Sequence, residues 1–301
     1  MNRTHTAQII RAVPSGGQNP PEDASPPATL GRILVDAGRL SPTDAQRIDQ
    51  AMRDRATGFA EAGSALRLVS DDDVRYALSV QFGFPYVDGD SRLDRSLVAA
   101  YHPETQEVEQ LRALRSQLML RWFDAGHRRH ALSVVSAAQG EGRSYIAANL
   151  AIVFSQLGER TLLIDADMRS PSHHRLFDLG HRAGLSDMLA RRAGPEAVAR
   201  IPELPNLSVL AAGTVPPNPQ ELLERQGFGA LLDAFADEYS FILIDTPPAS
   251  QCADAQTVAV RAGAALIVAR QNRSSMPQMA RFAQSLRDFG VTLVGSVLND
   301  A

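Results

Sequence analysis

One glycine-rich stretch has the composition of a phosphate-binding loop. It reads SAAQGEGRSYIAANLA from Ser136 and directly follows the apolar run ALSVVS. Gly140 and Gly142 let backbone N–H groups turn inward toward an anion, and a helix that starts at the end of the loop adds a favourable dipole. Ser144 is placed to give its hydroxyl to Mg²⁺. The predicted nucleotide contacts of this stretch are Gly140, Glu141, Gly142, Arg143, Ser144 and Tyr145.

Arg143 stands where such a loop normally carries lysine. Lysine gives a compact charge to the β- and γ-phosphates, whereas arginine is a longer planar fork that still binds phosphate bidentately. We therefore expect nucleotide binding without fast turnover, and we count Arg143 among the catalytic residues.

Three aspartates end two later apolar runs. Asp165 and Asp167 close the run in LLIDADMR, and Asp245 closes the run in FILIDTPP. Carboxylates at strand ends can hold a hydrated metal ion and accept a proton from an attacking group. A single such aspartate could equally be a solvated strand end, but three beside a phosphate loop favour a site. We expect Asp167 and Asp245 to organise Mg²⁺ with Ser144, and Asp165 to be the base.

The elements that must position these residues form an alternating pattern. Short runs rich in Val, Ile and Leu recur from Ala131 onward, and helical patterns cover 145–156, 220–235 and 276–289. Buried strands that alternate with helices indicate a mainly parallel sheet covered on both faces, with its ligand at the carboxyl ends of the strands. The sequence thus predicts an α/β fold of the P-loop NTPase type, preceded by a small helical domain.

The first hundred residues divide into three parts. Residues 1–28 are rich in Pro, Ser and Gly and predict a disordered tail. The pattern of residues 29–88 predicts a small helical domain, in which Ser41 and Ser70 are N-caps. Within it the segment LGRILVDAGRLSPTDA is weakly repeated as EAGSALRLVSDDDV. Residues 89–104 predict a linker, and 105–301 the ATP-binding domain.

Bulk composition excludes several classes of protein. The formal net charge of −4 and the pI near 6.0 give no support for a nucleic-acid partner. The single cysteine, Cys252, rules out an intramolecular disulfide framework and fits a reducing cytoplasm. No apolar run is long enough to cross a bilayer, which takes about 18–20 residues. We therefore expect a cytoplasmic protein that reaches the membrane only through a partner.

From about Val108 to Ala301 the chain resembles the bacterial tyrosine kinases that accompany polysaccharide export. The resemblance rests on GEGRS followed by AANLA, on IDADMR, on LIDTPP and on AGTVPPNPQELL. It is greatest to the chain-length-determinant kinases of the EpsG type, in which arginine in GEGRSY is usual. It implies that ATP and Mg²⁺ are the cofactors and that Asp165 accepts the proton of the substrate tyrosine. It also implies that Asn299 contacts the adenine base.

The same resemblance implies partners. Glu109, Arg112 and Arg115 form E-x-x-R-x-x-R, which lies along one helix face and in this family docks one subunit onto the next in a ring. A separate membrane-embedded chain-length determinant, or co-polymerase, would activate the ring at the inner face of the plasma membrane. A salt-bridged surface helix is the other interpretation of this motif.

The chain departs from the family in one place. These kinases usually end in a tyrosine-rich tail, whereas here Asp300 and Ala301 follow the last apolar run and the five tyrosines are scattered. We therefore expect the phosphoacceptor to lie elsewhere.

The helical domain resembles modules at the front of type II secretion ATPases, some of which bind cyclic di-GMP. Their ligand motif begins with Arg-Leu-Gly and occurs twice. Here Thr29 and Gly58 stand where the two arginines would be, and Ala60 replaces a glycine of the second copy, so cyclic di-GMP is not expected as a ligand.

Two other functions stay open. A positioning ATPase of the MinD/ParA type shares the fold, but it would carry a second lysine early in the loop, where this chain has Ala138. A nucleotide-gated scaffold without phosphotransfer is the other alternative, and Arg143 keeps it open.

Overall fold

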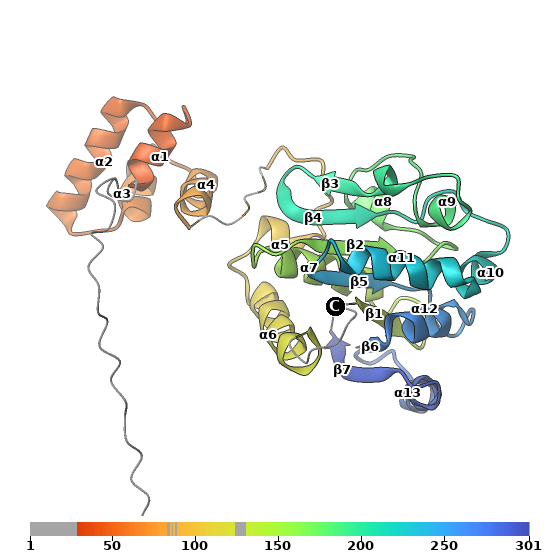
Figure 1. Ribbon diagram of the computed structural model, residues 1–301. Helices are drawn as coiled ribbons and strands as arrows, with labels where there is room; N and C mark the ends of the chain where they lie inside the picture. Colours follow the sequence, from red (N-terminus) through yellow and green to blue (C-terminus); the bar gives the residue numbers. More distant parts are fainter. Residues whose placement is uncertain (1–28, 83–84, 86, 88, 124–130, 301) are drawn as a thin grey trace, which may run out of the picture.

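The computed structural model describes residues 29–82, 85, 87, 89–123 and 131–300. A group of four helices precedes a larger α/β unit (Figure 1). The predicted disordered tail, 1–28, lies outside the described residues. Within the described part of the chain, no helix is both long and apolar enough to cross a membrane.

The described helices and strands include those that the sequence pattern predicts and several short ones besides. The helices are α1 (Leu30–Asp36), α2 (Pro42–Arg55), α3 (Phe59–Ala65), α4 (Asp71–Phe82), α5 (Val98–Tyr101), α6 (Gln106–Arg121), α7 (Arg143–Ser155), α8 (His173–Leu176), α9 (Leu185–Leu189), α10 (Pro219–Glu224), α11 (Gln226–Ala236), α12 (Asp254–Ala262) and α13 (Met276–Asp288), with a 3₁₀ turn at Pro195–Ala197. The strands are β1 (Ala131–Ser136), β2 (Thr161–Asp165), β3 (Ala199–Ile201), β4 (Leu204–Leu210), β5 (Phe241–Asp245), β6 (Ala264–Arg270) and β7 (Thr292–Asn299).

The seven strands form one sheet in the order β3-β4-β2-β5-β1-β6-β7. All neighbouring strands are parallel except β3 and β4, which form an antiparallel pair at one edge. Asp165 and Asp245 are register partners at the carboxyl ends of β2 and β5. The predicted α/β fold of the P-loop NTPase type is confirmed.

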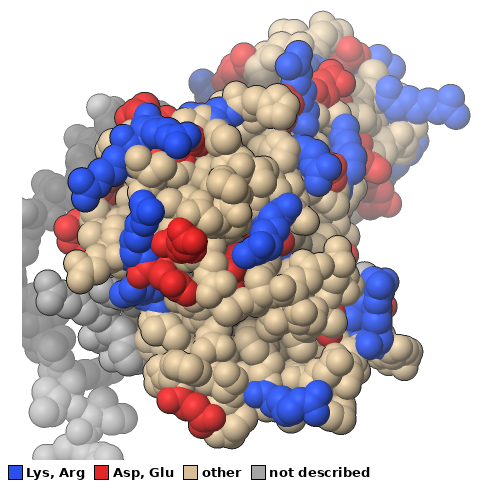
Figure 2. Space-filling model, turned by 90° about the vertical axis from the view of Figure 1, so that its right-hand side faces the viewer, with Lys and Arg blue, Asp and Glu red and all other residues tan. Residues whose placement is uncertain are grey.

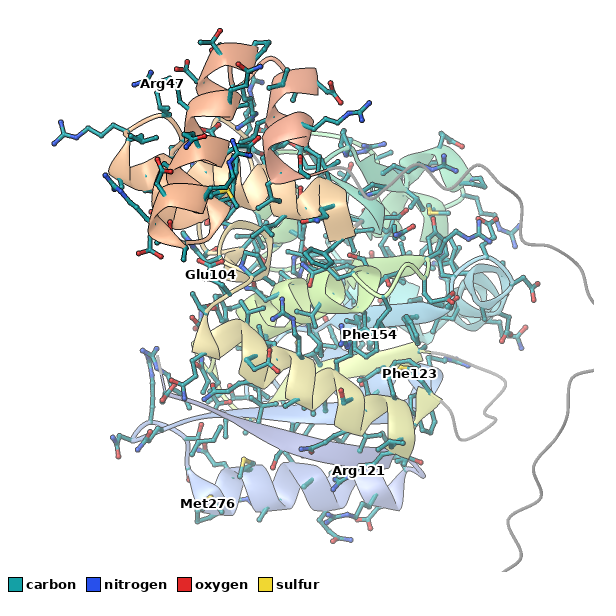
Figure 3. All side chains as sticks on the ribbon, turned by 90° about the vertical axis from the view of Figure 1, so that its left-hand side faces the viewer. Arg47, Glu104, Arg121, Phe123, Phe154 and Met276 are labelled. Carbon is teal, nitrogen blue, oxygen red and sulfur yellow. The ribbon has the colours of Figure 1, made fainter. Side chains whose placement is uncertain are left out.

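Helices cover both faces of this sheet. One face packs on α5, α6 and α7, and the opposite face packs on α9, α11, α12 and α13. On the first face Phe123, Phe154 and Phe241 form an aromatic cluster, with ring centroids 4.8 to 5.2 Å apart. Figure 3 shows Phe123 and Phe154 close together near the end of α6. Continuous apolar strands are stable here because neither face of the sheet meets water.

The stretch predicted as a linker, 89–104, is not a free connection. Leu93, Leu97 and Tyr101 are buried in the same core as α7. Asn149 of α7 accepts the Ala99 N–H at 3.0 Å and donates to the Ser96 carbonyl at 3.0 Å. Apolar residues four apart, in a segment otherwise rich in polar residues, gave too weak a pattern to predict this packing.

The helical unit contains two copies of one helix–turn–helix. In each copy a seven-residue helix ends in a residue with left-handed backbone, which is Gly38 (φ +70°) in the first and Arg67 (φ +56°) in the second. A serine N-cap then starts the next helix: Ser41 accepts from the Asp44 N–H at 3.1 Å, and Ser70 from the Asp73 N–H at 3.2 Å. The weak sequence duplication thus corresponds to a repeated local structure.

Candidate nucleotide and metal site

The predicted phosphate loop spans the gap between β1 and α7. Its last residue, Gly142, has a φ of +92°, and a Cβ built there would lie 2.1 Å from the Asn299 Nδ2 atom. That amide donates to the Glu141 carbonyl at 3.2 Å. Only glycine satisfies both the backbone angle and this close approach. The end of β7 therefore holds the loop in shape, although 157 residues separate Gly142 from Asn299 in the chain.

Glu141 stabilises the loop from inside. Its carboxylate is buried, accepts the Ala138 N–H at 2.7 Å and accepts the Ser274 hydroxyl. The end of β6 adds a further contact, because Arg270 Nη1 donates to the Gly140 carbonyl at 3.2 Å. The contacts of Glu141 thus lie within the protein, and they shape the loop into which a phosphate would fit.

The Arg143 guanidinium is turned into the protein. Its Nε donates to the Thr246 carbonyl at 2.6 Å, and its Nη1 donates to the Ser136 hydroxyl at 2.6 Å. Two carboxylates lie at ion-pair distance, with 3.7 Å from Nη2 to Asp167 Oδ2 and 3.9 Å from Nε to Asp245 Oδ1. The side chain is only 7% exposed. Arg143 therefore joins the ends of β1 and β5 and partly neutralises both predicted metal ligands.

The arginine in this loop agrees with the composition of the whole chain. All 30 of its Lys and Arg residues are arginine, so lysine is absent from the sequence altogether. An arginine at position 143 is therefore no special mark of a degenerate loop.

The three predicted acids meet as expected, but their surroundings differ. Asp165 is fully buried: Oδ1 accepts the Asp167 N–H at 3.1 Å, and Oδ2 accepts the N–H groups of Ser172 and His173 at 3.0 and 3.1 Å. Asp167 Oδ1 accepts the N–H groups of Arg169 and Ser170, while its Oδ2 faces Arg143. Asp165 therefore fixes the loop after β2, and Asp167 keeps one oxygen free of backbone donors.

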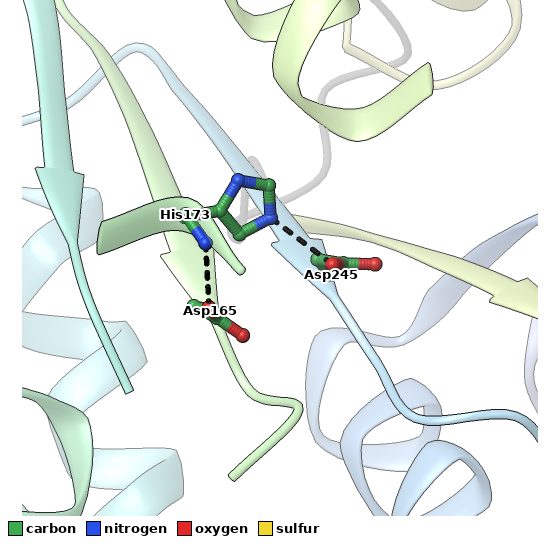
Figure 4. A group of neighbouring side chains, drawn as sticks. All are labelled: Asp165, His173 and Asp245. Atoms are coloured by element: carbon green, nitrogen blue, oxygen red, sulfur yellow. Dashed lines mark hydrogen bonds and ion pairs between the residues drawn. The ribbon is translucent and has the colours of Figure 1, made fainter. Parts of the chain in front are cut away.

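His173 is the main residue of this site that sequence reasoning missed. Its Nε2 lies 3.0 Å from Asp245 Oδ2, and both side chains are fully buried (Figure 4). One ligand atom each from Asp165, His173 and Asp245 fall within 4.8 Å of one another. His173 Nδ1 is buried, and no group of the described residues forms a hydrogen bond with it. Nothing local to the run SPSHHRLF marks its first histidine, since only the fold brings it to β5.

Burial dominates the electrostatics of this cluster. It raises the pKa of Asp165 to about 6, against the opposing charge of His173, and the neighbouring Asp245 raises it further. Burial also raises the pKa of Asp167. For His173, burial opposes the charged form, but the bond to Asp245 and the charges of Asp165 and Asp245 outweigh it and raise the pKa. Protons are therefore held more tightly in this cluster than in water.

The donor set suits a hard cation and a phosphate. Carboxylate and hydroxyl oxygens are the ligands that Mg²⁺ prefers, and Asp167, Asp245 and Ser144 supply them at the carboxyl edge of the sheet. The loop of Gly140 and Gly142 ends at the N-terminus of α7, a helix of 13 residues, which favours an anion. The residues present therefore fit a nucleotide with its metal ion.

A cavity lies beside the phosphate loop, on the β7 side. It measures about 330 Å³ and is lined by residues of α6, the start of α7 and the end of β7, including Leu114, Tyr145, Val297 and Asn299. The Tyr145 hydroxyl donates to the Glu107 carboxylate, and burial together with that acid raises the Tyr145 pKa. Tyr145 therefore contributes to the wall of a half-apolar cavity of a size that suits a base or sugar.

The three residues of the predicted ring motif lie on α6 but have different partners. Arg112 Nη1 donates to Glu109 Oε2 at 3.1 Å, an exposed pair one turn apart. Arg115 instead donates to the Val153 carbonyl at 2.8 Å, in the last turn of α7. Helix ends leave carbonyls without intrahelical donors, so Arg115 caps α7. Glu109 and Arg112 are the members of the motif that remain at the surface.

Charge on the face beside α9, α10 and α12 is mixed. Figure 2 shows basic and acidic side chains interspersed there, with no continuous basic surface. This mixture agrees with the net charge of −4.

Comparison with known proteins gives consistent matches. A sequence model of the ParA family, described as NUBPL iron-transfer P-loop NTPase, matches residues 127–300. The chain is 33% identical over 209 residues to the tyrosine-protein kinase YwqD of Bacillus subtilis (strain 168), which covers 69% of this chain and 87% of that protein. It is 34% identical over 203 residues to the tyrosine-protein kinase wzc of Salmonella typhimurium (strain LT2), covering 67% of this chain but 28% of wzc.

The fold agrees with these matches. The kinase domain of the Escherichia coli tyrosine kinase ETK superposes with a TM-score of 0.66 at 30% identity, covering 71% of this chain and 83% of that one. The chain spans little more than a quarter of the length of the longer relatives, wzc among them. The similarity therefore concerns the nucleotide-binding unit.

Proposed function

The chain belongs to the bacterial tyrosine kinases within the ParA family of P-loop NTPases, and from this premise we propose that it is an ATP-dependent protein-tyrosine kinase of exopolysaccharide export. The observation that carries the proposal is the convergence of Arg143, Asp167 and Asp245 at the end of a phosphate loop. These groups place charge where a transferring phosphoryl group would develop it.

ATP is the phosphoryl donor in this proposal. The loop from Gly140 to Ser144 holds the phosphates with its backbone N–H groups. Asn299 borders the cavity on the β7 side, which would hold the adenine base. Ser144, Asp167 and Asp245 would hold Mg²⁺, which would supply positive charge to the phosphates. The arginine must leave its bonds to Thr246 and Ser136, at least in part, to reach a phosphate. Slow turnover follows from that requirement.

Phosphoryl transfer forms a bond from the tyrosine oxygen to the γ-phosphorus and breaks the bond from that phosphorus to the bridging oxygen of ADP. The phenolic proton must pass to a base within hydrogen-bond reach. Asp165 is the base that the sequence predicts, but both of its oxygens accept backbone N–H groups and it has no exposed surface. We therefore assign proton acceptance to Asp167 Oδ2 and a positioning role to Asp165.

Kinase assays on single variants separate these two roles. Radiolabelled ATP is added to the purified protein with Mg²⁺, and phosphotyrosine is measured. We expect Asp167→Asn to abolish transfer with the fold intact, and Asp165→Asn to lower thermal stability while leaving measurable transfer. The reverse result, no transfer in Asp165→Asn with unchanged stability, would return the role of base to Asp165.

The proposal includes the biological setting of the relatives. The kinase would act with a membrane-embedded chain-length determinant at the inner face of the plasma membrane and regulate polymer length. A ring of subunits would use Glu109 and Arg112, because Arg115 is engaged within the subunit. Replacing Glu109 and Arg112 by alanine should then reduce oligomer size in light scattering, whereas Arg115→Ala should mainly lower thermal stability.

One observation favours a second function, a nucleotide-gated scaffold without phosphotransfer. The inward bonds of Arg143 withdraw its charge from the loop. The radiolabelling assay distinguishes the two functions. ATP binding without phosphotyrosine, on the protein itself or on its membrane partner, would support the scaffold and reject the kinase.

A further inference from the structure

Another cavity lies at the carboxyl edge of the sheet, on the side away from β7. It measures about 440 Å³ and lies between the loop after β2 and the loop after β4. The residues that carry the inference are Pro171, His174, His181, Arg182, Gly213 and Thr214. Among the residues that the structure describes, none that lines this cavity is acidic.

The wall formed by the loop after β4 is rigid. Gly213 has a φ of +81°, and a Cβ built on Gly184 would lie 2.1 Å from the Ala211 carbonyl oxygen. Asp187 Oδ2 accepts the N–H groups of both Gly184 and Thr214 at 3.1 Å, and Ser186 donates to the Thr214 carbonyl at 2.6 Å. These bonds hold the two loops against each other, so the cavity has a preformed back wall.

The order of the strands places this cavity in line with the nucleotide site. The end of β7 carries Asn299, β1 leads into the phosphate loop, and β5 and β2 carry the metal ligands. The cavity follows next, over the ends of β2 and β4, whose residues Ile164 and Leu210 are register partners. At about 4.8 Å between neighbouring strands, only about 14 Å separate β1 from β4.

Phosphoryl transfer requires the attacking and leaving oxygens to lie on opposite sides of the phosphorus. In the proposed function the nucleoside lies toward β7, so the leaving oxygen lies on that side. The attacking tyrosine must then enter from the side of β2 and β4. The cavity beside His174 lies on that side.

Its lining indicates the chemistry of the entering segment. The imidazoles of His174 and His181 are stacked with centroids 6.4 Å apart, and the exposed Arg182, which also lines the cavity, donates to the Glu196 carbonyl at 3.1 Å. Burial and the neighbouring Arg175 lower the pKa of His174, so the constant positive charge of the lining is that of Arg182, and none of the described lining residues is a carboxylate. We propose that this cavity docks the acceptor, a tyrosine-bearing polypeptide segment with acidic residues next to the tyrosine. This inference rests on the proposed kinase function and adds its acceptor site.

The test compares three synthetic peptides that carry one tyrosine between glutamates, serines or arginines. Phosphate transfer from radiolabelled ATP gives KM and kcat for each peptide with the full-length protein. We expect the glutamate peptide to have the lowest KM. The double variant His181→Gln, Arg182→Ser should raise that KM about tenfold and change the KM for ATP by less than twofold. Arg200→Ala, an exposed arginine on β3 outside the cavity, is the matched control and should behave as wild type.

Unchanged KM values for the glutamate peptide in the double variant would overturn the docking proposal and leave the kinase function standing. Fluorescence anisotropy of a labelled glutamate peptide tests docking even without transfer. If the wild type phosphorylates no tyrosine, the kinase function fails, and equal peptide binding by wild type and double variant then overturns the docking site as well. Displacement of the peptide by an equal concentration of inorganic phosphate would also overturn it, because the cavity would then bind only an anion.

Discussion

The Nε2 atom of His173 lies 3.0 Å from Oδ2 of Asp245, and both side chains are completely shielded from solvent. The Thr246 N–H donates to the other oxygen, Oδ1, at 3.0 Å. The carboxylate is thus held at both oxygens at the end of β5. Partners of this kind orient a metal ligand and tune its charge.

His173→Ala should therefore lower the affinity of the site for Mg²⁺. Removal of the imidazole leaves Asp245 Oδ2 without its partner, and loss of such a partner typically lowers metal affinity about 10- to 100-fold. His173→Gln, whose amide can still donate to Asp245, should recover most of this loss. ATP binding titrated with Mg²⁺ measures both effects. Wild-type Mg²⁺ dependence in a folded His173→Ala would contradict the assignment.

Gly142→Ala should abolish ATP binding. The new methyl group would lie 2.1 Å from Asn299 Nδ2, at a φ of +92° that L-residues rarely adopt. Asn299→Ala removes the clash but not the backbone strain. We expect the double variant Gly142→Ala, Asn299→Ala to bind ATP better than Gly142→Ala but worse than Asn299→Ala in calorimetry. Full recovery in the double variant would show that the clash alone was responsible.

Arg143→Ala should destabilise the protein as well as impair nucleotide binding. It takes a buried counter-charge away from the carboxylates of Asp167 and Asp245, a loss that typically costs about 3–5 kcal/mol. Arg143→Lys keeps the charge and offers it to the compact γ-phosphate position. We expect the Arg143→Lys variant to bind ATP and to retain or raise the phosphotransfer rate. Its free energy of unfolding in chemical denaturation should lie between those of the wild type and Arg143→Ala. Equal stability of wild type and Arg143→Ala would argue against the inward guanidinium.

Asp187 should make the stability of the β4 side depend on pH. Burial raises its pKa, but the N–H groups of Thr214 and Gly184 outweigh burial and lower the pKa below its ordinary value. Such a carboxylate stabilises the fold above its unfolded pKa, and this contribution is lost as pH falls through the folded pKa. Asp187→Ala should therefore cost about 1–3 kcal/mol at pH 7, less at pH 3.

Thermal unfolding of the full chain at the two pH values measures this change, and Asp237→Ala, an exposed acid, is the control. A deficit in Asp187→Ala that is the same at pH 3 and pH 7 would show that packing, not the carboxylate charge, is responsible.

Arg67→Gly should stabilise the helical unit, because Arg67 has a φ of +56° where its counterpart in the first copy is Gly38. Relief of left-handed strain is expected to give about 0.5–1 kcal/mol, partly offset by the entropy of glycine. Gly38→Ala is the reciprocal change and should destabilise by about the same amount. Hydrogen exchange of the α1 to α4 amides reports the local stability of this unit in the full chain. Faster exchange in Arg67→Gly would contradict the expected relief.

The sequence by itself determined the larger pattern. Buried parallel strands read as continuous apolar runs, so β1, β5 and β6 lie where ALSVVS, FILID and AALIVAR predict them. Since parallel strands carry their carboxyl ends to one edge, Asp165, Asp167 and Asp245 had to meet the loop around Gly142 there. The predicted helix over 220–235 was real but is broken at Arg225 into α10 and α11. The short antiparallel β3 had no pattern strong enough to predict.

Tertiary structure decided which way each polar group faces. A rotamer depends on partners that lie far away in the chain: Arg143 finds Thr246 across 103 residues, and His173 finds Asp245 across 72. The same holds for the packing of Leu97 and Tyr101 on α7, for the capping of α7 by Arg115, and for the cavity beside His174. Spacing along a chain encodes the period of a helix or strand, whereas a side chain's partner across the fold is set by the packing of the elements, which no local pattern records.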